Sequence, residues 1–259
     1  MSKEIEIKTS RMYDGTKTWN PFKGCYYNCK YCVPSFQQQA KRQMHNCTEC
    51  YEFRPHQHLE RLSKIPNAAI VFVGGNGDIS FCDPAFVKQI IAAIVKKNLK
   101  RPNQVYYFQT KRPEYLEQFI DDFPPNVILV TTLETNRDDG YGAVSKAPPP
   151  SMRYAQFKHL KWNHKVVTVE PAMDFDVDEF AESLISLKPE YVWLGFNSRP
   201  KSVSLPEPPK EKMLALAERL KKAGIQVRGK ELWGLDLEKP EVTPTWTDED
   251  IEAEARRLF

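Results

Sequence analysis

Short runs of β-branched and aromatic residues recur along the chain and predict buried strands. Six of these runs lie at 68–73, 104–108, 127–134, 165–170, 191–196 and 225–229. A further strand is expected near 16–22, which brings the total to about seven.

Amphipathic stretches separate the strands and carry the residue types that begin and end helices. These signals are Asp83-Pro84, Pro113, Asp176 with Glu179 three residues later, and Gly224 after the stretch 210–222. Regular alternation of strand and helix indicates right-handed βαβ crossovers. With seven strands rather than eight, the pattern favours an α/β fold, an incomplete (β/α)6-7 TIM-like barrel that is open on one side. A doubly wound sheet is the alternative.

The predicted domain organisation is one partial barrel over 1–238, followed by a tail, 239–259, with a short helix. A polar, cysteine-bearing insertion, 33–66, interrupts the barrel, and long loops are expected at 137–152 and 199–209. Loops of this length are uncommon unless they have a function, and in barrels the loops after the strands carry the chemistry.

Composition limits the possible classes of protein. With 41% hydrophobic residues the chain can bury a core, so wholesale disorder is excluded. The formal charge of +3 is too small to make duplex binding the obvious purpose. No apolar run approaches the roughly 20 residues of a bilayer helix, and the N-terminus has no apolar signal region. We therefore expect a soluble, cytoplasmic protein with no membrane association.

The six cysteines all lie in the first third of the chain, at Cys25, Cys29, Cys32, Cys47, Cys50 and Cys82. Tight spacing without a secretory signal favours metal or cluster ligation over disulfides. The first three are spaced as CxxxCxxC. A [4Fe–4S] cluster normally takes four thiolates, so three from one loop would leave one iron open to another ligand. A tetrahedral zinc site completed by a fourth thiolate or imidazole is the alternative.

The spacing, with the aromatic Tyr31 before the last cysteine, resembles the radical S-adenosylmethionine (SAM) superfamily. The resemblance implies that the open iron binds SAM and that an electron from a flavodoxin- or ferredoxin-type reductant generates a 5′-deoxyadenosyl radical. Over 18–234 the chain also resembles a little-characterised radical SAM family of phages and prokaryotes, through the words TWNP, HLERL, VFVGGNGD, QTKRPEYL, TLETN, VEP and GKELWG. The first two cysteines are often further apart in that family, so equal substrates should not be assumed.

Polar residues follow the predicted strands and would meet at one mouth of the barrel. The resemblance places a glycine-rich turn against the methionyl amino group of SAM. The expected cofactor-binding residues are Gly74, Gly75, Asn76, Asp78, Thr110, Lys111, Thr132, Glu134 and Asn136. Glu170, Asn197 and Lys230 are expected to face substrate. The alternative for any one of them is a solvated loop charge or a helix cap.

The remaining cysteines allow several interpretations. Cys47 and Cys50, with His45, His56 and His58 nearby, supply enough ligands for a zinc ion. They could instead be a redox pair or inert thiols. Cys82 could donate a hydrogen atom near the cofactor, or be a small buried apolar residue.

The leading hypothesis is a radical SAM enzyme that reductively cleaves SAM and abstracts hydrogen from an unidentified substrate. A nucleic-acid base or nucleotide is the first candidate, because the family is distantly similar to radical repair lyases and the cysteine region carries aromatic and basic residues. These residues are Tyr26, Tyr27, Tyr31, Tyr51, Phe53, Lys23, Lys30, Lys41, Arg42 and Arg54. A small molecule or a peptide is the alternative substrate. The alternative function is a zinc-binding, non-catalytic module that interacts with nucleic acid or protein.

Overall fold

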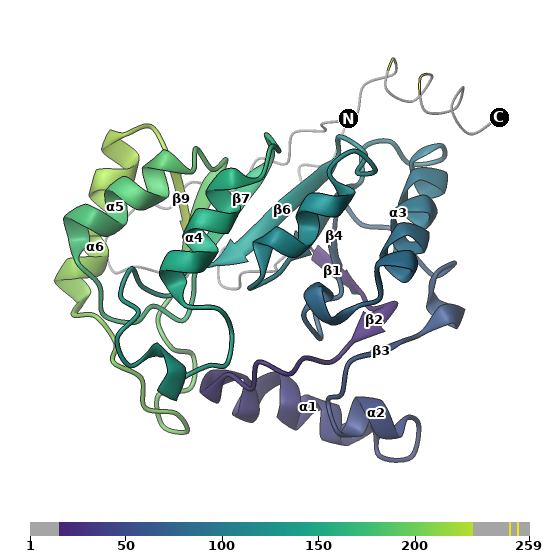
Figure 1. Cartoon of the computed structure of the whole chain (residues 1–259), viewed down its shortest axis with the longest axis horizontal. Helices are drawn as coiled ribbons and strands as arrows, with labels where there is room; N and C mark the ends of the chain where they lie inside the picture. The colour runs from purple at the N-terminus through teal and green to yellow at the C-terminus, as the bar shows by residue number, and fades with distance from the viewer. Residues whose placement is uncertain (1–15, 230–248, 250–252, 254–259) are drawn as a thin grey trace, which may run out of the picture.

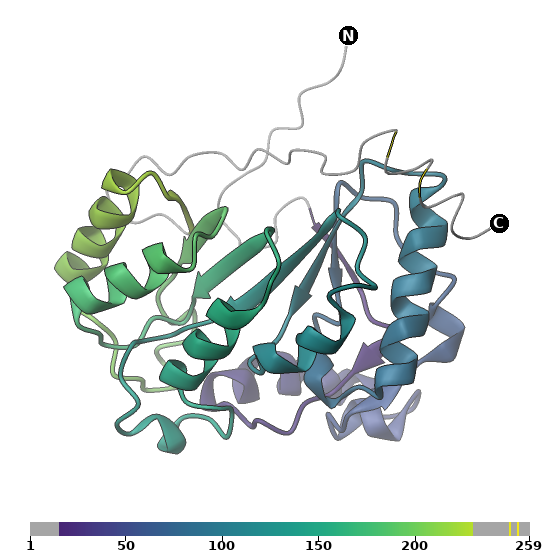
Figure 2. The same ribbon diagram turned by 45° about the horizontal axis from the view of Figure 1, so that its top comes forward.

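The computed structural model describes residues 16–229 together with 249 and 253. Within this part of the chain, seven parallel strands form a curled, half-barrel sheet in which spatial order follows chain order (Figures 1 and 2). They are β1 (Thr16–Trp19), β4 (Ile70–Val73), β5 (Val105–Gln109), β6 (Val127–Thr132), β7 (Lys165–Val169), β8 (Tyr191–Leu194) and β9 (Gln226–Gly229). The incomplete TIM-like barrel is thus confirmed. The doubly wound alternative is wrong, because such a sheet reverses its strand order partway along.

Both faces of the sheet are apolar. Alternate residues such as Val71 and Phe108 pack into the main core with the helices. Their neighbours Phe72 and Tyr107 face the other way and form a separate cluster with Trp193 on the inner face. Because side chains alternate along a strand, both faces must be apolar for the sheet to be buried on both sides.

The helices cover one face of the sheet (Figure 1). They are α3 (Pro84–Asn98), α4 (Pro150–His159), α5 (Val177–Ser186) and α6 (Lys210–Lys222), with the 3-10 helix η6 (Pro113–Phe119) after β5. The predicted start of α3 is confirmed, since the Asp83 carboxylate accepts hydrogen bonds from the Ala85 and Phe86 amides at 2.9 and 3.3 Å. Gly224, with φ of +80°, follows α6 as expected.

Two helical features differ from expectation. The Asp176 side chain does not cap α5, because both of its oxygens accept hydrogen bonds from the Arg137 guanidinium, at 2.9 and 2.5 Å. Helix α4 begins inside the segment 137–152 that was expected to be a loop. Two prolines precede this helix and a third is its first residue, and its amphipathic pattern is weak because the charged Arg153 is fully buried together with the apolar Phe157.

The segment 33–66 folds back onto residues 22–23. It contains short helical turns, α1 (Gln38–Ala40) and α2 (Thr48–Tyr51), and then β3 (His56–Gln57), which pairs antiparallel with β2 (Phe22–Lys23). Figure 1 places these elements together, below the main sheet in that view. The insertion is therefore attached to the residues that immediately precede Cys25.

Lys230 and all but two residues of the tail 239–259 lie outside the described residues, so the predicted domain boundary stays a prediction. Among the helices that the structure describes, none combines the length and the apolar character that crossing a bilayer requires.

Candidate active site

The three-cysteine loop follows β1 and is hydrogen-bonded to three other segments, one of which is 144–146, where the Lys30 amide donates to the Val144 carbonyl at 2.9 Å. Gly24 donates its amide to the Asn76 carbonyl at 3.0 Å, and the Asp78 amide donates to the Gly24 carbonyl at 3.1 Å. On the other side, the Cys25 amide donates to the Phe53 carbonyl at 3.2 Å. The loop therefore lies between the glycine-rich turn after β4 and the segment 33–66.

The close approach of these segments explains two glycines. Gly24 has φ of +92°, and a Cβ built on it would lie 2.0 Å from the Arg54 carbonyl oxygen. A Cβ on Gly77 would lie 2.6 Å from the Gly24 oxygen. Backbone atoms cannot move aside as a flexible side chain can, so no larger residue fits at either position without separating the segments.

Replacing Gly24 with alanine is expected to displace the loop. The added methyl group meets backbone and the positive φ is unfavourable, so the destabilisation should reach about 2 kcal/mol or more, together with reduced iron loading. Gly142→Ala is the matched control, because a Cβ there has open space. Thermal unfolding and iron content measure both variants, and equal behaviour of the two would contradict the close approach described here.

The three thiols share one apolar environment. Cys29 is buried, while Cys25 and Cys32 are partly buried against a hydrophobic cluster that includes Tyr141 and Met173. Burial raises the pKa of Cys32 to about 12, and it raises the pKa of Cys25 still further. Thiols in such surroundings stay protonated unless a cation compensates the thiolate charge. The donor set therefore fits a positively charged metal group.

Hydrogen bonds also reach two of the sulfur atoms. Cys29 Sγ lies 3.0 Å from Ser145 Oγ, and the Tyr27 amide donates to Cys25 Sγ at 3.4 Å. Hydrogen bonds to ligand sulfurs are among the features that set the potential of an iron–sulfur group. Ser145 could not be identified from the sequence, because it is 116 residues away along the chain from Cys29.

Glu134 lies at the centre of a buried polar network beside this loop. Its Oε1 accepts hydrogen bonds from Tyr31 Oη at 2.5 Å and Tyr141 Oη at 3.2 Å, and it also contacts the Lys111 ammonium. Its Oε2 accepts from Arg153 Nη2 at 2.7 Å. Tyr31 is the aromatic residue of the cysteine motif, so this network ties the loop to the ends of β5 and β6.

The charges of this network decide the protonation state of Glu134. Burial by itself would raise the pKa of its carboxyl group, but the Arg153 and Lys111 cations outweigh burial and lower the pKa to about 2. Arg153 also lies over the Tyr141 ring, 4.9 Å from its centroid. Neither Arg153 nor Tyr141 was among the residues expected at this site. A lone arginine on a helix is usually solvated, so no local signal marks it.

Asp78 is fully engaged by protein groups. Its carboxylate accepts hydrogen bonds from Thr110 Oγ1 at 2.6 Å, the Lys111 amide at 2.8 Å, and the amide and hydroxyl of Ser80 at 3.0 and 2.8 Å. Burial raises the pKa of Asp78 despite these donors. In this structure Asp78 and Thr110 join the ends of β4 and β5. Contact with SAM stays a prediction for both residues.

The other residues expected at the mouth also have protein partners. Thr132 Oγ1 accepts from Gln109 Nε2 at 2.8 Å, and Asn136 Oδ1 accepts from the Asp176 amide at 3.0 Å. Further partners are Trp193 Nε1, which donates to Glu170 Oε2 at 2.7 Å, and the Val203 carbonyl, which accepts from Asn197 Nδ2 at 2.8 Å. The roles of Gly74, Gly75, Asn76, Lys111, Thr132, Glu134 and Asn136 toward SAM, and of Glu170, Asn197 and Lys230 toward substrate, stay predictions.

Cys82 does not belong to the apolar cluster that surrounds the three-cysteine loop. It is buried in the main core near α3, and burial raises the pKa of its thiol to about 12. Its carbonyl accepts a hydrogen bond from Tyr115 Oη at 2.5 Å. This placement favours a packing role over hydrogen-atom donation, which stays a prediction.

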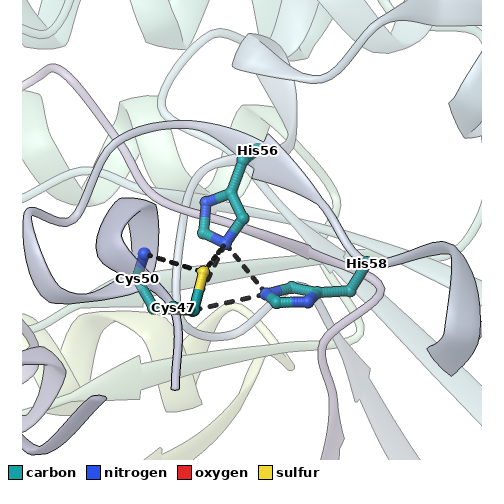
Figure 3. A group of neighbouring side chains, drawn as sticks. All are labelled: Cys47, Cys50, His56 and His58. Carbon is teal, nitrogen blue, oxygen red and sulfur yellow. Dashed lines mark hydrogen bonds between the residues drawn. The ribbon is translucent and has the colours of Figure 1, made fainter. Parts of the chain in front are cut away.

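The second cysteine group does come together. Ligand atoms of Cys47, Cys50, His56 and His58 all lie within 4.8 Å of one another (Figure 3). His45, the fifth residue of the predicted set, is exposed and lies outside this group. Cys47 immediately precedes α2 and Cys50 lies within it, whereas His56 belongs to β3.

Comparison with known proteins identifies the fold. No protein-family model and no curated protein match the sequence. Among solved structures, a cysteine-to-serine mutant of spore photoproduct lyase matches with a TM-score of 0.51 and 14% identity, over 99% of this chain and 76% of the other. A double mutant of that lyase with bound AdoMet and dinucleoside spore photoproduct gives a TM-score of 0.51 and 13% identity, over 97% and 75%. The chain therefore shares its fold with these structures of spore photoproduct lyase.

Proposed function

We propose that this protein is a radical SAM enzyme in which Cys25, Cys29 and Cys32 hold a [4Fe–4S] cluster and the adjoining strand ends bind SAM. The observation that carries the proposal is the position of the loop. Its three thiols follow the first strand of a parallel half-barrel and lie against the turn that ends the second. In barrels, that end of the sheet is where active sites occur.

The donor set favours a cluster over a single zinc ion. One tetrahedral ion holds its ligand sulfurs less than about 4 Å apart, because each lies about 2.3 Å from the metal. In the described part of the chain, the residues close enough to share one ion are the Cys47 group, and the three-cysteine loop does not belong to such a group. A cluster with one thiolate on each of three irons accepts wider spacing and leaves the fourth iron open.

The residues of this chain would prepare the site rather than perform the redox step. When bound, the cluster would supply the electron for reductive cleavage of SAM. Tyr31, held by Glu134 and Lys111, fixes the loop against the strand ends. The apolar residues around Cys29, among them Val144 and Met173, exclude water from the thiolates. Excluding water is what protects a reactive intermediate from side reactions.

For the substrate we infer a nucleic-acid base or nucleotide. A pocket lies beside the loop and includes Lys23, Phe36, Arg42 and Phe53 in its lining, together with the Asn76 of the glycine-rich turn. Cations that neutralise phosphate and aromatic rings that stack on bases are the usual means of holding an extruded nucleotide. The structural likeness to a lyase with a bound dinucleoside supports the same class.

The non-catalytic zinc-binding module is the second candidate function. The observation in its favour is the metal-competent group at Cys47, Cys50, His56 and His58. This function would not account for the three-cysteine loop, in which Cys29 is buried and Cys25 and Cys32 are partly buried. A metal at the second group is also compatible with an enzyme.

Anaerobic reconstitution with iron and sulfide tests the proposal. The expected result is about four irons and four sulfides per chain, absorbance near about 400 nm, and formation of 5′-deoxyadenosine when dithionite or reduced flavodoxin is added with SAM. Oligonucleotides deuterated on their bases or sugars should transfer deuterium into the deoxyadenosine. Failure to assemble a cluster, or a cluster whose spectrum ignores SAM, would overturn the enzyme proposal. Absence of deuterium transfer from every nucleotide tested would overturn the substrate class alone.

A further inference from the structure

We propose that Cys47, Cys50, His56 and His58 form a second metal centre, a tetrahedral site for one divalent cation of the zinc class. The four side chains point toward one common position in Figure 3. Two thiols and two imidazoles are a common ligand set of structural zinc. This centre is separate from the three-cysteine loop and does not depend on the enzyme proposal.

The distances between the ligand atoms match those around a single ion. Cys50 Sγ lies 3.2 Å from His56 Nε2 and 3.3 Å from His58 Nε2, and Cys47 Sγ lies 3.5 Å from His56 Nε2. The two Nε2 atoms are 2.8 Å apart. Around tetrahedral zinc, sulfur and nitrogen ligands lie about 3.5 Å apart and two nitrogens about 3.3 Å apart. These four distances therefore differ by about half an ångström or less from those around a bound ion, and all the ligand atoms of the group lie within 4.8 Å of one another.

The tautomers of the two histidines strengthen the inference. His56 Nδ1 lies 2.7 Å from the Arg54 carbonyl oxygen, and His58 Nδ1 lies 3.0 Å from Glu60 Oε1. A carbonyl and a carboxylate only accept, so both Nδ1 atoms carry the proton. With the proton on Nδ1, a metal-binding imidazole presents the lone pair of Nε2, and the two Nε2 atoms lie 2.8 Å apart, so their lone pairs face each other. A shared cation removes their repulsion, and an acceptor on Nδ1 is the usual arrangement in a metal-bound histidine.

Charge around the sulfurs is consistent with a bound cation. Two thiolates and a divalent ion sum to zero, so the centre can be partly buried without a net charge. Lys23 Nζ lies 3.4 Å from Cys50 Sγ and can donate a hydrogen bond to that sulfur. Cys50 is buried and His58 is nearly so, which limits access of solvent to the ion.

The position of the centre suggests what it does for the loop beside it, and this step rests on the proposed function. The carbonyl oxygen of Arg54 accepts a hydrogen bond from His56 Nδ1 and also lies against Gly24. The carbonyl of the preceding residue, Phe53, accepts a hydrogen bond from the Cys25 amide. Also, the His58 amide donates to the Pro21 carbonyl at 2.6 Å. A metal that joins α2 to β3 would therefore hold the backbone on which the first cluster ligand depends.

Metal analysis of the full-length chain tests the centre. The chain is prepared with Cys25, Cys29 and Cys32 all replaced by serine, so that iron cannot load the first site. About one zinc per chain is expected, falling below about a tenth in His58→Ala and remaining in His45→Ala, the matched control from the same segment. Cobalt should replace zinc and give the thiolate charge-transfer and d–d bands of a tetrahedral site.

A conservative variant separates loss of a ligand from loss of the fold. His56→Cys should keep the metal, because three thiolates and one histidine also bind zinc, whereas His56→Ala should lose it. The proposal would be overturned if the protein kept its fold without binding a metal, or if Cys47 and Cys50 formed a disulfide instead of binding one. Because the serine background already lacks the cluster ligands, failure of the cluster proposal leaves this result unchanged.

Discussion

Replacing Cys29 with serine is expected to abolish iron–sulfur loading and SAM cleavage together. Cys29 is the most buried of the three thiols and bonds to Ser145, so a hydroxyl there has neither the soft sulfur that iron prefers nor room for a replacement ligand from solvent. Formation of 5′-deoxyadenosine should fall to the background of the assay. Iron and sulfide analysis after anaerobic reconstitution measures loading, and chromatography of the SAM products measures cleavage.

Cys82→Ala is the matched control for this experiment. Cys82 is as buried as Cys29, but it lies in the main core rather than in the apolar cluster of the loop. The variant should lose about 1 kcal/mol of unfolding free energy and load its cluster normally. If the Cys29 variant assembled a full cluster that still cleaved SAM, these three cysteines would not be the ligands.

Replacing Glu134 with glutamine is expected to produce the largest loss of stability. Its carboxylate is fully buried and pairs with Arg153, which is equally buried, and with Lys111. An amide of similar shape leaves these two cations without a compensating charge. Breaking a buried pair from one side costs about 3–5 kcal/mol. Denaturant unfolding at neutral pH measures the loss, and the melting temperature should fall by roughly 6–20 °C.

The same carboxylate should give the wild-type protein a characteristic response to acid. Its folded pKa of about 2 lies below the ordinary value of 4.5, so its contribution to stability is present above about pH 4.5 and is lost as the pH falls toward 2. The shift corresponds to about 3 kcal/mol. The difference in unfolding free energy between wild type and the glutamine variant should therefore narrow across that range.

Glu114→Gln is the control for the Glu134 experiments. Glu114 also pairs with an arginine, Arg112, but both side chains are about half exposed. Exposed pairs contribute about 0–1 kcal/mol, so this variant should unfold almost as the wild type does. Equal losses in the two glutamate variants would show that the buried network does not carry the stability assigned to it.

The sequence by itself determined the features that depend on local pattern. Short β-branched and aromatic runs placed six of the seven strands within two residues of their observed ends, because buried parallel strands are rich in such residues. The other strand, expected near 16–22, ends three residues earlier than expected. The cap of α3 was equally readable, since Asp83 bonds to amides two and three residues away. The spacing of three cysteines within eight residues also predicted that they lie close together, because so short a loop keeps them in one environment.

Only the tertiary structure decided which distant residues meet. Arg153 reaches Glu134 across 19 positions, and Ser145 reaches Cys29 across 116. The tertiary structure also decided which histidines join the second cysteine group. Pairing of β3 with β2 brings His56 and His58, but not His45, close to Cys50. The physical reason is common to all of these contacts. A buried charge or thiol is stabilised by whichever partner the fold brings within hydrogen-bond distance, and spacing along the chain does not record that partner.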